Sequence, residues 1–233
     1  MIRTRSALDK ALAKLQANIV RLSSMVEQAI DQAMQALKTR NIELAQTVIA
    51  NDHFINQLRY EIEESAILTL STQSPRAGDL RMVIAAIHIA IELERMGDHA
   101  AGISRLVERM DAKSEISSLH SLPKMAKRVK KMVTLAIDAF IADDDELARD
   151  MMRRDQKIDR GYAKLFAQAL VEMSDDSYAE IATYLLWVGH SLERIGDRCV
   201  NIAERVVFMV TGNLQEGVTT DYEPRFTTVG PAS

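Results

Sequence analysis

The chain has 233 residues, of which 47% are hydrophobic and 27% charged, with nine glycines and four prolines. This composition favours a large, mostly helical core with few breaks. The formal net charge of −4 argues against a general nucleic-acid binder, which needs a concentrated basic surface. The longest apolar run, 82–91, is far shorter than the ~20 residues that span a bilayer, so we expect a cytoplasmic protein without membrane insertion.

Apolar residues at heptad spacing predict three helices in the first half of the chain. The first helix has its apolar seam over 8–36, and the second has its inward residues over 44–62. Ser74 and Pro75 predict the start of the third helix, with the serine as its cap. The seam of this third helix contains Met82, Ala86, Ile89, Leu93, Met96, Ala100, Ile103 and Val107.

The second half repeats the pattern after a serine-containing linker. A fourth helix begins near Leu122, acids at 143–145 are expected to cap a fifth, and Asp175 or Asp176 to open a sixth. The sixth helix repeats the seam of the third at Ile181, Leu185, Val188, Leu192, Ile195, Cys199, Ile202 and Val206. Cys199 therefore reads as a core residue rather than a reactive thiol.

These segments predict an all-α fold of two tandem three-helix bundles, an internal duplication with six long helices. We expect the first bundle to occupy residues 1–112 and the second to occupy 118–211. Residues 212–233 contain little apolar material and are expected to form a mobile tail.

One pentapeptide pattern occurs in both halves, as ERMGD at 94–98 and as ERIGD at 193–197. Each copy places two acids one helical turn apart, which destabilises an isolated helix by roughly 0.2–0.5 kcal/mol. Something outside the helix is therefore expected to neutralise them. The glycine in each motif costs about 1 kcal/mol relative to alanine, and a close approach of another backbone or of a ligand would explain it.

The heptad positions put these acids on the outer face, far from the seam. Acids recur at outward positions on other helices, and the candidate metal ligands are Glu27, Asp31, Asp52, Glu94, Asp98, Asp155, Asp159, Glu193 and Asp197. Clustered carboxylates suit hard cations such as magnesium, manganese, calcium or iron, and zinc is a further candidate. His190 and Asn201 could add ligands, although a structural role is favoured for both. Asn56 takes the place of Asp159 in the first half, so we expect unequal binding by the two bundles.

Ile84, Ile87 and Ile91 lie at outer positions just before the first acidic motif. A freely solvated face is not expected to be this apolar. We therefore predict that a partner covers it, most simply a second copy of the chain in a homodimer.

The two acidic motifs, together with 25–28, 79–81 and 155–159, resemble the PhoU family of phosphate transport regulatory proteins. The resemblance covers about residues 5–210. It implies tandem three-helix bundles, metal sites on the bundle surfaces and no catalytic activity. It also implies a negative regulator of the phosphate-starvation response, whose partners are the ATPase subunit of a phosphate ABC transporter and a sensor histidine kinase.

The residues themselves leave one alternative open, a metal-buffering or metal-storage bundle. An enzyme is disfavoured, because the sequence contains no phosphate-binding glycine loop, no HExxH and no GxSxG. A di-iron oxidase would need Glu-x-x-His pairs inside a four-helix bundle, whereas these acids are predicted to face outward.

Overall fold

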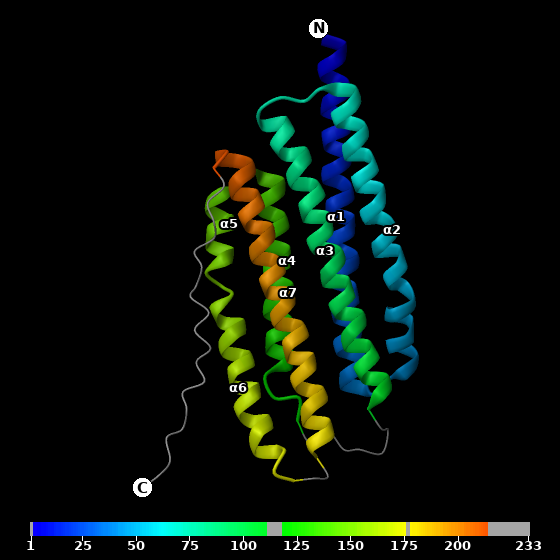
Figure 1. Ribbon diagram of the computed structural model, residues 1–233, viewed down its shortest axis with the longest axis vertical. Helices are drawn as coiled ribbons and strands as arrows, with labels where there is room; N and C mark the ends of the chain where they lie inside the picture. Colours follow the sequence, from blue (N-terminus) through cyan, green and yellow to red (C-terminus); the bar gives the residue numbers. More distant parts are fainter. Residues whose placement is uncertain (1, 111–117, 176–177, 214–233) are drawn as a thin grey trace.

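The computed structural model describes residues 2–110, 118–175 and 178–213, and these residues fold into two helical bundles that lie side by side (Figure 1). The expected all-α fold of tandem three-helix bundles is confirmed. The first bundle contains α1 (Ile2–Thr39), α2 (Ile42–Gln73) and α3 (Gly78–Arg109). The second contains α4 (Leu122–Ala142), α5 (Asp145–Met152), α6 (Gln156–Glu172) and α7 (Ala179–Thr211).

The heptad seams form the core. All eight predicted seam residues of α3 and all eight of α7 are buried, and the buried side chains of both bundles join into one continuous cluster. Cys199 has no exposed surface, and burial raises the pKa of its thiol well above the ordinary value, as expected for a core residue. Among the described helices, none is long and apolar enough to cross a membrane.

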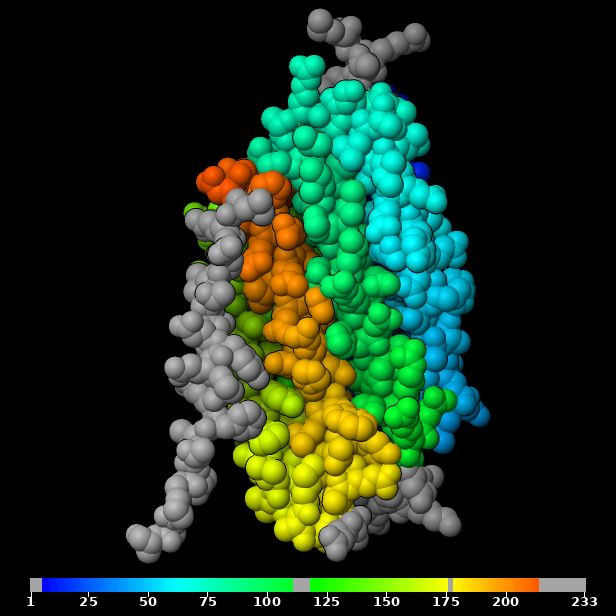
Figure 2. Space-filling view, in the orientation of Figure 1, coloured from blue at the N-terminus to red at the C-terminus, as the bar shows by residue number. Residues whose placement is uncertain are grey.

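The bundles meet through their central helices, with α3 packed against α7 and α1 against α4. Figure 2 shows α3 in green and α7 in orange in contact along the visible face. At this contact Glu92 Oε2 accepts hydrogen bonds from Arg198 (3.3 Å) and Asn201 (3.2 Å). Asn201 therefore ties the bundles together, which agrees with the structural role favoured for it. Helices α2, α5 and α6 lie on the outer sides.

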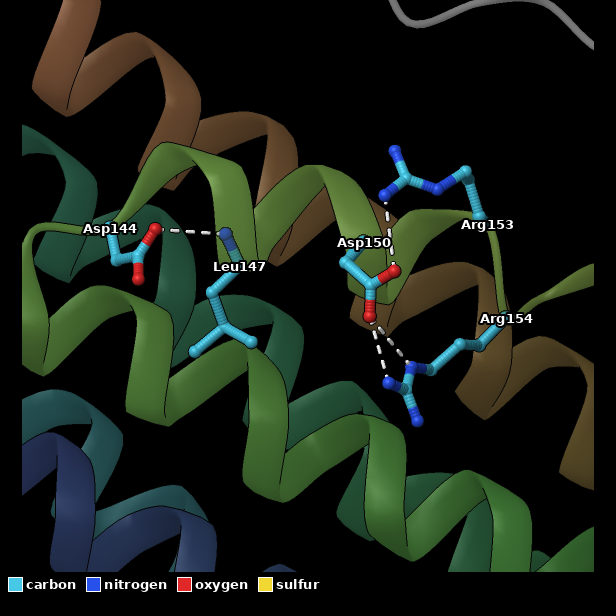
Figure 3. Close-up of polar contacts among 5 residues, drawn as sticks. All are labelled: Asp144, Leu147, Asp150, Arg153 and Arg154. Carbon is cyan, nitrogen blue, oxygen red and sulfur yellow. Dashed lines mark hydrogen bonds and ion pairs between the residues drawn. The ribbon is translucent and has the colours of Figure 1, made fainter.

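The fifth predicted helix is interrupted and forms α5 and α6. Asp144 caps α5 as expected, because its carboxylate accepts a hydrogen bond from the backbone N–H of Leu147 at 2.8 Å. At the other end of α5, Asp150 accepts hydrogen bonds from Arg153 and Arg154 (Figure 3). The backbone N–H of Arg154 bonds three residues back, to Met151, and this tight turn ends the helix before α6 begins.

One expected helix start is wrong. Ser74 ends α2 in a left-handed conformation with φ of 46°, and α3 begins at Gly78. Helix α7 begins at Ala179, and the carbonyl of Asp175 accepts hydrogen bonds from the backbone N–H groups of Tyr178 and Ala179. Asp176 and residues 214–233 of the expected tail lie outside the described residues.

The outer isoleucines of α3 are less exposed than expected. Ile84, Ile87 and Ile91 are all half-buried, and Ile87 packs against the core. The face is flanked by α2 on one side and by α7 on the other. Homodimerisation through this face stays a prediction.

Candidate metal centres

The second bundle brings four of the predicted acids together. Asp155 lies at the start of α6 and Asp159 one turn later, while Glu193 and Asp197 lie on the facing part of α7. Burial raises the pKa of Asp159, Glu193 and Asp197, and the charge of Asp197 raises the pKa of the other two further. A site that raises the pKa of every carboxyl in it favours either protons or a metal cation.

Asp155 is the most perturbed of the four. Burial, together with the smaller effects of the charges of Asp159, Asp197 and Glu193, raises its pKa from 3.8 to about 7. Its Oδ1 atom is buried and has no hydrogen-bond partner. Arg194 is 3.1 Å from Asp197, but no ion pair reaches Asp155 in the described part of the chain. A buried, unpartnered carboxylate oxygen costs free energy unless a cation or proton satisfies it.

The motif glycines explain how the acids approach. A Cβ atom on Gly196 would lie 2.9 Å from Asp155 Oδ1, and one on Gly97 would lie 3.0 Å from Ile55 Cδ1 and 3.3 Å from Asp52 Oδ1. The predicted close approach is therefore found in both copies. It is made by side chains of the neighbouring helix rather than by a backbone. Glycine at this position allows an aspartate on the outer helix to reach the glutamate and aspartate of the motif.

The equivalent cluster in the first bundle has different internal partners. Asp52 and Glu94 have raised pKa values, caused by burial and then by the charge of Asp98. Asn56 donates a hydrogen bond to Asp52 Oδ2 at 3.3 Å. The Arg59 guanidinium is 4.0 Å from Glu94 Oε1, and it provides an internal cation that sequence reasoning missed. The equivalent glutamate of the second cluster, Glu193, is paired with His190 instead.

Glu27 and Asp31 face a different neighbour. Thr134 of α4 donates a hydrogen bond to Glu27 Oε1 at 3.3 Å, and Lys130 forms an ion pair with Asp31. Both acids are thus directed to the contact between α1 and α4. A metal ion there would have to compete with Lys130.

His190 has a partner within the second cluster. Its Nδ1 atom lies 3.1 Å from Glu193 Oε2.

In the ranges 2–110, 118–175 and 178–213, no group of three or more His, Cys, Asp or Glu side chains is already arranged to hold a metal ion. The acids are close enough to perturb one another, but their side chains must rotate before they can share one ion.

Comparison with known proteins decides the family. The model of the PhoU domain matches residues 19–107 and 122–206, one match in each bundle. The chain belongs to the PhoU family. It is 37% identical to a Zymomonas mobilis PhoU homologue over 90% of this chain and 89% of the relative. It is 32% identical to a PhoU homologue from Clostridium acetobutylicum over 90% of this chain and 96% of the relative.

Solved PhoU structures have the same fold. The PhoU crystal structure from Streptococcus pneumoniae matches with a TM-score of 0.84 at 31% identity, and covers 90% of this chain and 99% of that one. The crystal structure of PhoU from Pseudomonas aeruginosa matches with a TM-score of 0.82 at 31% identity, and covers 88% of this chain and 99% of that one. The two PhoU domain matches contain every candidate ligand, from Glu27 to Asp197.

We predict that the second-bundle cluster binds a divalent cation more tightly than the first. It has four acids where the first has three and Asn56, and hard cations respond strongly to ligand charge. In calorimetric titrations with Mn²⁺, Asp159→Asn is expected to weaken the tightest site at least about tenfold, and Asn56→Asp to strengthen the weaker one.

Glu27→Ala is the matched control, because it removes an acid that lies toward α4. If Glu27→Ala abolishes the tightest site while Asp159→Asn leaves it unchanged, the ranking of the two clusters is wrong.

Proposed function

We propose that this chain is a regulatory, non-enzymatic accessory protein of a phosphate transport system. It acts in the cytoplasm as a metal-binding adaptor that couples a phosphate ABC transporter to a sensor histidine kinase, and it represses the phosphate-starvation response when phosphate is plentiful. The observation that carries the proposal is the match over about 90% of both chains to relatives named phosphate-specific transport system accessory protein PhoU homolog.

The acidic clusters fit the metal part of the proposal. Asp155 holds a buried oxygen without a partner, and the carboxyls around it have raised pKa values. A bound cation would supply positive charge that neutralises these carboxylates. The protein's own contribution is to hold the acids on two helices, α6 and α7, so that ligation by both links the outer helix of the bundle to its central one.

The adaptor part follows from the position of the clusters. Each lies between an outer helix and a central helix, and Asp98 and Asp159 are exposed. The ATPase subunit and the kinase are proposed to dock on these acidic faces through basic or helical elements. Charge complementarity of this kind sets specificity and association rate more than affinity. A homodimer would present both faces twice.

The test is expression from a phosphate-starvation promoter at high phosphate in a strain that lacks this gene. Deletion is expected to derepress the reporter, and the wild-type gene to restore repression. A variant with Glu193→Ala and Asp197→Ala is expected to restore it poorly at normal protein level. The matched control carries Glu64→Ala and Glu108→Ala, which remove two exposed acids that contribute to neither cluster, and it is expected to repress fully.

Two outcomes would redirect the proposal. Full repression in the deletion strain, together with a changed cellular metal content, would make the chain a metal buffer or store. Full repression by the Glu193→Ala and Asp197→Ala variant would separate the regulatory role from the acidic cluster.

A further inference from the structure

A second charged feature lies on the outer side of the second bundle. A groove of about 520 Å³ runs between α4 and α6, at the end where the linker enters α4. The helices are close here, since a Cβ atom on Gly161 would be 2.8 Å from Met125 Cγ, and Ser121 Oγ donates a hydrogen bond to the Gly161 carbonyl at 2.9 Å. Five cations line the groove, namely Lys124 and Arg128 from α4 and Lys157, Arg160 and Lys164 from α6.

The internal partners of these cations are backbone carbonyls, since Arg128 donates a hydrogen bond to the Lys157 carbonyl at 2.9 Å and Arg160 to the Gln156 carbonyl at 3.0 Å. Among the described residues no acid lines the groove, and none of the five cations has an ion pair. His120 at one end is 2.9 Å from Glu172, and Arg160 lowers the pKa of the neighbouring Asp159. Arg160 and Lys164 stand one helical turn apart, a spacing at which like charges destabilise a helix. The positive end of the α4 dipole adds to the same field.

The first bundle has an overlapping groove with a different charge, since among the described residues Asp52 and Glu61 line it beside a single cation, Arg21. Its groove, of about 380 Å³, lies between α1 and α2, which correspond to α4 and α6 in the duplication. The positions equivalent to Lys157, Arg160 and Lys164 are Phe54, Gln57 and Glu61, and all three line the first groove. Arg128 is different, because Arg21 at the equivalent position also lines the first groove. The fold therefore forms a groove without the three cations of α6, and these three belong to the second bundle alone.

We propose that the groove between α4 and α6 binds a chain of linked phosphate groups. The cations of α6 lie between positions 157 and 164, which are seven helical steps or roughly 10 Å apart, and this is longer than one phosphate. Apart from Gly161, the described residues that line the groove have polar or charged side chains, and none of them is Phe, Tyr, Trp or aliphatic. A peptide would therefore find no apolar anchor among them, which protein interfaces usually need. Lysine and arginine are the residues that bind phosphates by charge and by paired hydrogen bonds.

The chain of linked phosphates could be inorganic polyphosphate or the triphosphate of a nucleotide. The proposal does not depend on the metal clusters or on the proposed adaptor role. Its test is calorimetric titration of the full chain, kept free of metal by a chelator, with tripolyphosphate, ATP and orthophosphate. Tripolyphosphate is expected to bind at least about tenfold more tightly than orthophosphate, and to bind more weakly as salt concentration rises.

Two double variants locate the site. Arg160→Gln with Lys164→Gln is expected to weaken tripolyphosphate binding at least about tenfold, by removing two of the five charges. The matched control is Lys127→Gln with Lys131→Gln, which removes two exposed lysines from α4 outside the groove, and its affinity is expected to change less than about twofold. All four side chains are exposed, and circular dichroism checks that both variants are folded.

The relative affinities of ATP and of inorganic phosphate chains distinguish a nucleotide from polyphosphate as the ligand. ATP binding as tight as that of tripolyphosphate supports a nucleotide, while tighter binding of longer inorganic chains supports polyphosphate. The proposal is overturned if neither phosphate chain binds in the millimolar range or below, or if the two double variants lose the same affinity. It is also overturned if a glutamate-rich peptide occupies the groove in preference to tripolyphosphate.

Discussion

Asparagine in place of Asp155 is expected to make the metal-free protein more stable above neutral pH. Burial raises the pKa of this carboxyl to about 7, against an ordinary value of 3.8. A group whose pKa is raised by folding contributes its stability below pH 3.8, and that contribution is lost as pH rises through 7. The free energy of unfolding of the wild type should therefore fall between about pH 4 and pH 8, and asparagine removes this fall.

The expected gain is about 2 kcal/mol at pH 8. Each unit between the folded and unfolded pKa corresponds to about 1.4 kcal/mol, but solvent screens this partly exposed group, so the full difference is not expected. Urea unfolding at pH 4, 6 and 8 with a chelator measures it. The gain should be near zero at pH 4, and added Mn²⁺ should stabilise the wild type more than Asp155→Asn.

Glu64→Gln is the control, because this acid is exposed on α2 and contributes to neither acidic cluster, so its replacement should change stability little. A gain for Asp155→Asn that is equal at pH 4 and pH 8 would contradict the link to the charge of the carboxylate.

Valine in place of Gly189 is expected to have the largest effect on stability. Gly189 is buried where α7 crosses α6, and a Cβ atom there would lie 2.3 Å from Leu165 Cδ2 and 3.2 Å from Tyr162 Cδ2. Leu165 is itself fully buried, so it has little room to move. Forcing extra atoms into a packed core costs about 1–3 kcal/mol, and we expect Gly189→Val to lie near the upper end of that range.

Gly102→Ala is the matched control on the other central helix. No atom lies within 4 Å of the Cβ that it would add, so the helix propensity of alanine should raise stability by up to about 1 kcal/mol. The two substitutions are therefore expected to have opposite signs in urea unfolding. A change of the same sign in both would mean that helix propensity, rather than the contact with Leu165, decides the result at Gly189.

Local patterns in the sequence were enough to predict the helices and their buried faces. A residue's position in a heptad fixes the side of the helix on which it lies, and the seams of α3 and α7 are buried as that rule requires. The cap at Asp144 was predictable for the same reason, because it involves only residues three positions apart. The duplicated acidic motifs placed a glutamate, a glycine and an aspartate equivalently in each half.

What helix periodicity could not give was the distance between side chains on different helices. The pairing of Glu27 with Thr134 depends on how α1 and α4 pack across the two bundles. The cation that Arg59 brings to Glu94 likewise comes from a neighbouring helix. The break between α5 and α6 was missed because Met151 and Ile158 on either side of it keep the heptad spacing of seven residues, although the residues 153–157 between them are all polar.

The sequence by itself determined the fold class, the duplication and the position of the acids away from the apolar seams, since each follows from spacing along the chain. Only the tertiary structure decided which acids share a cluster, how deeply Asp155 is buried, and that the cations of α4 face those of α6 across one groove. These properties depend on the rotation and closeness of neighbouring helices. Small residues such as Gly161 and Gly196 set that closeness at the crossings.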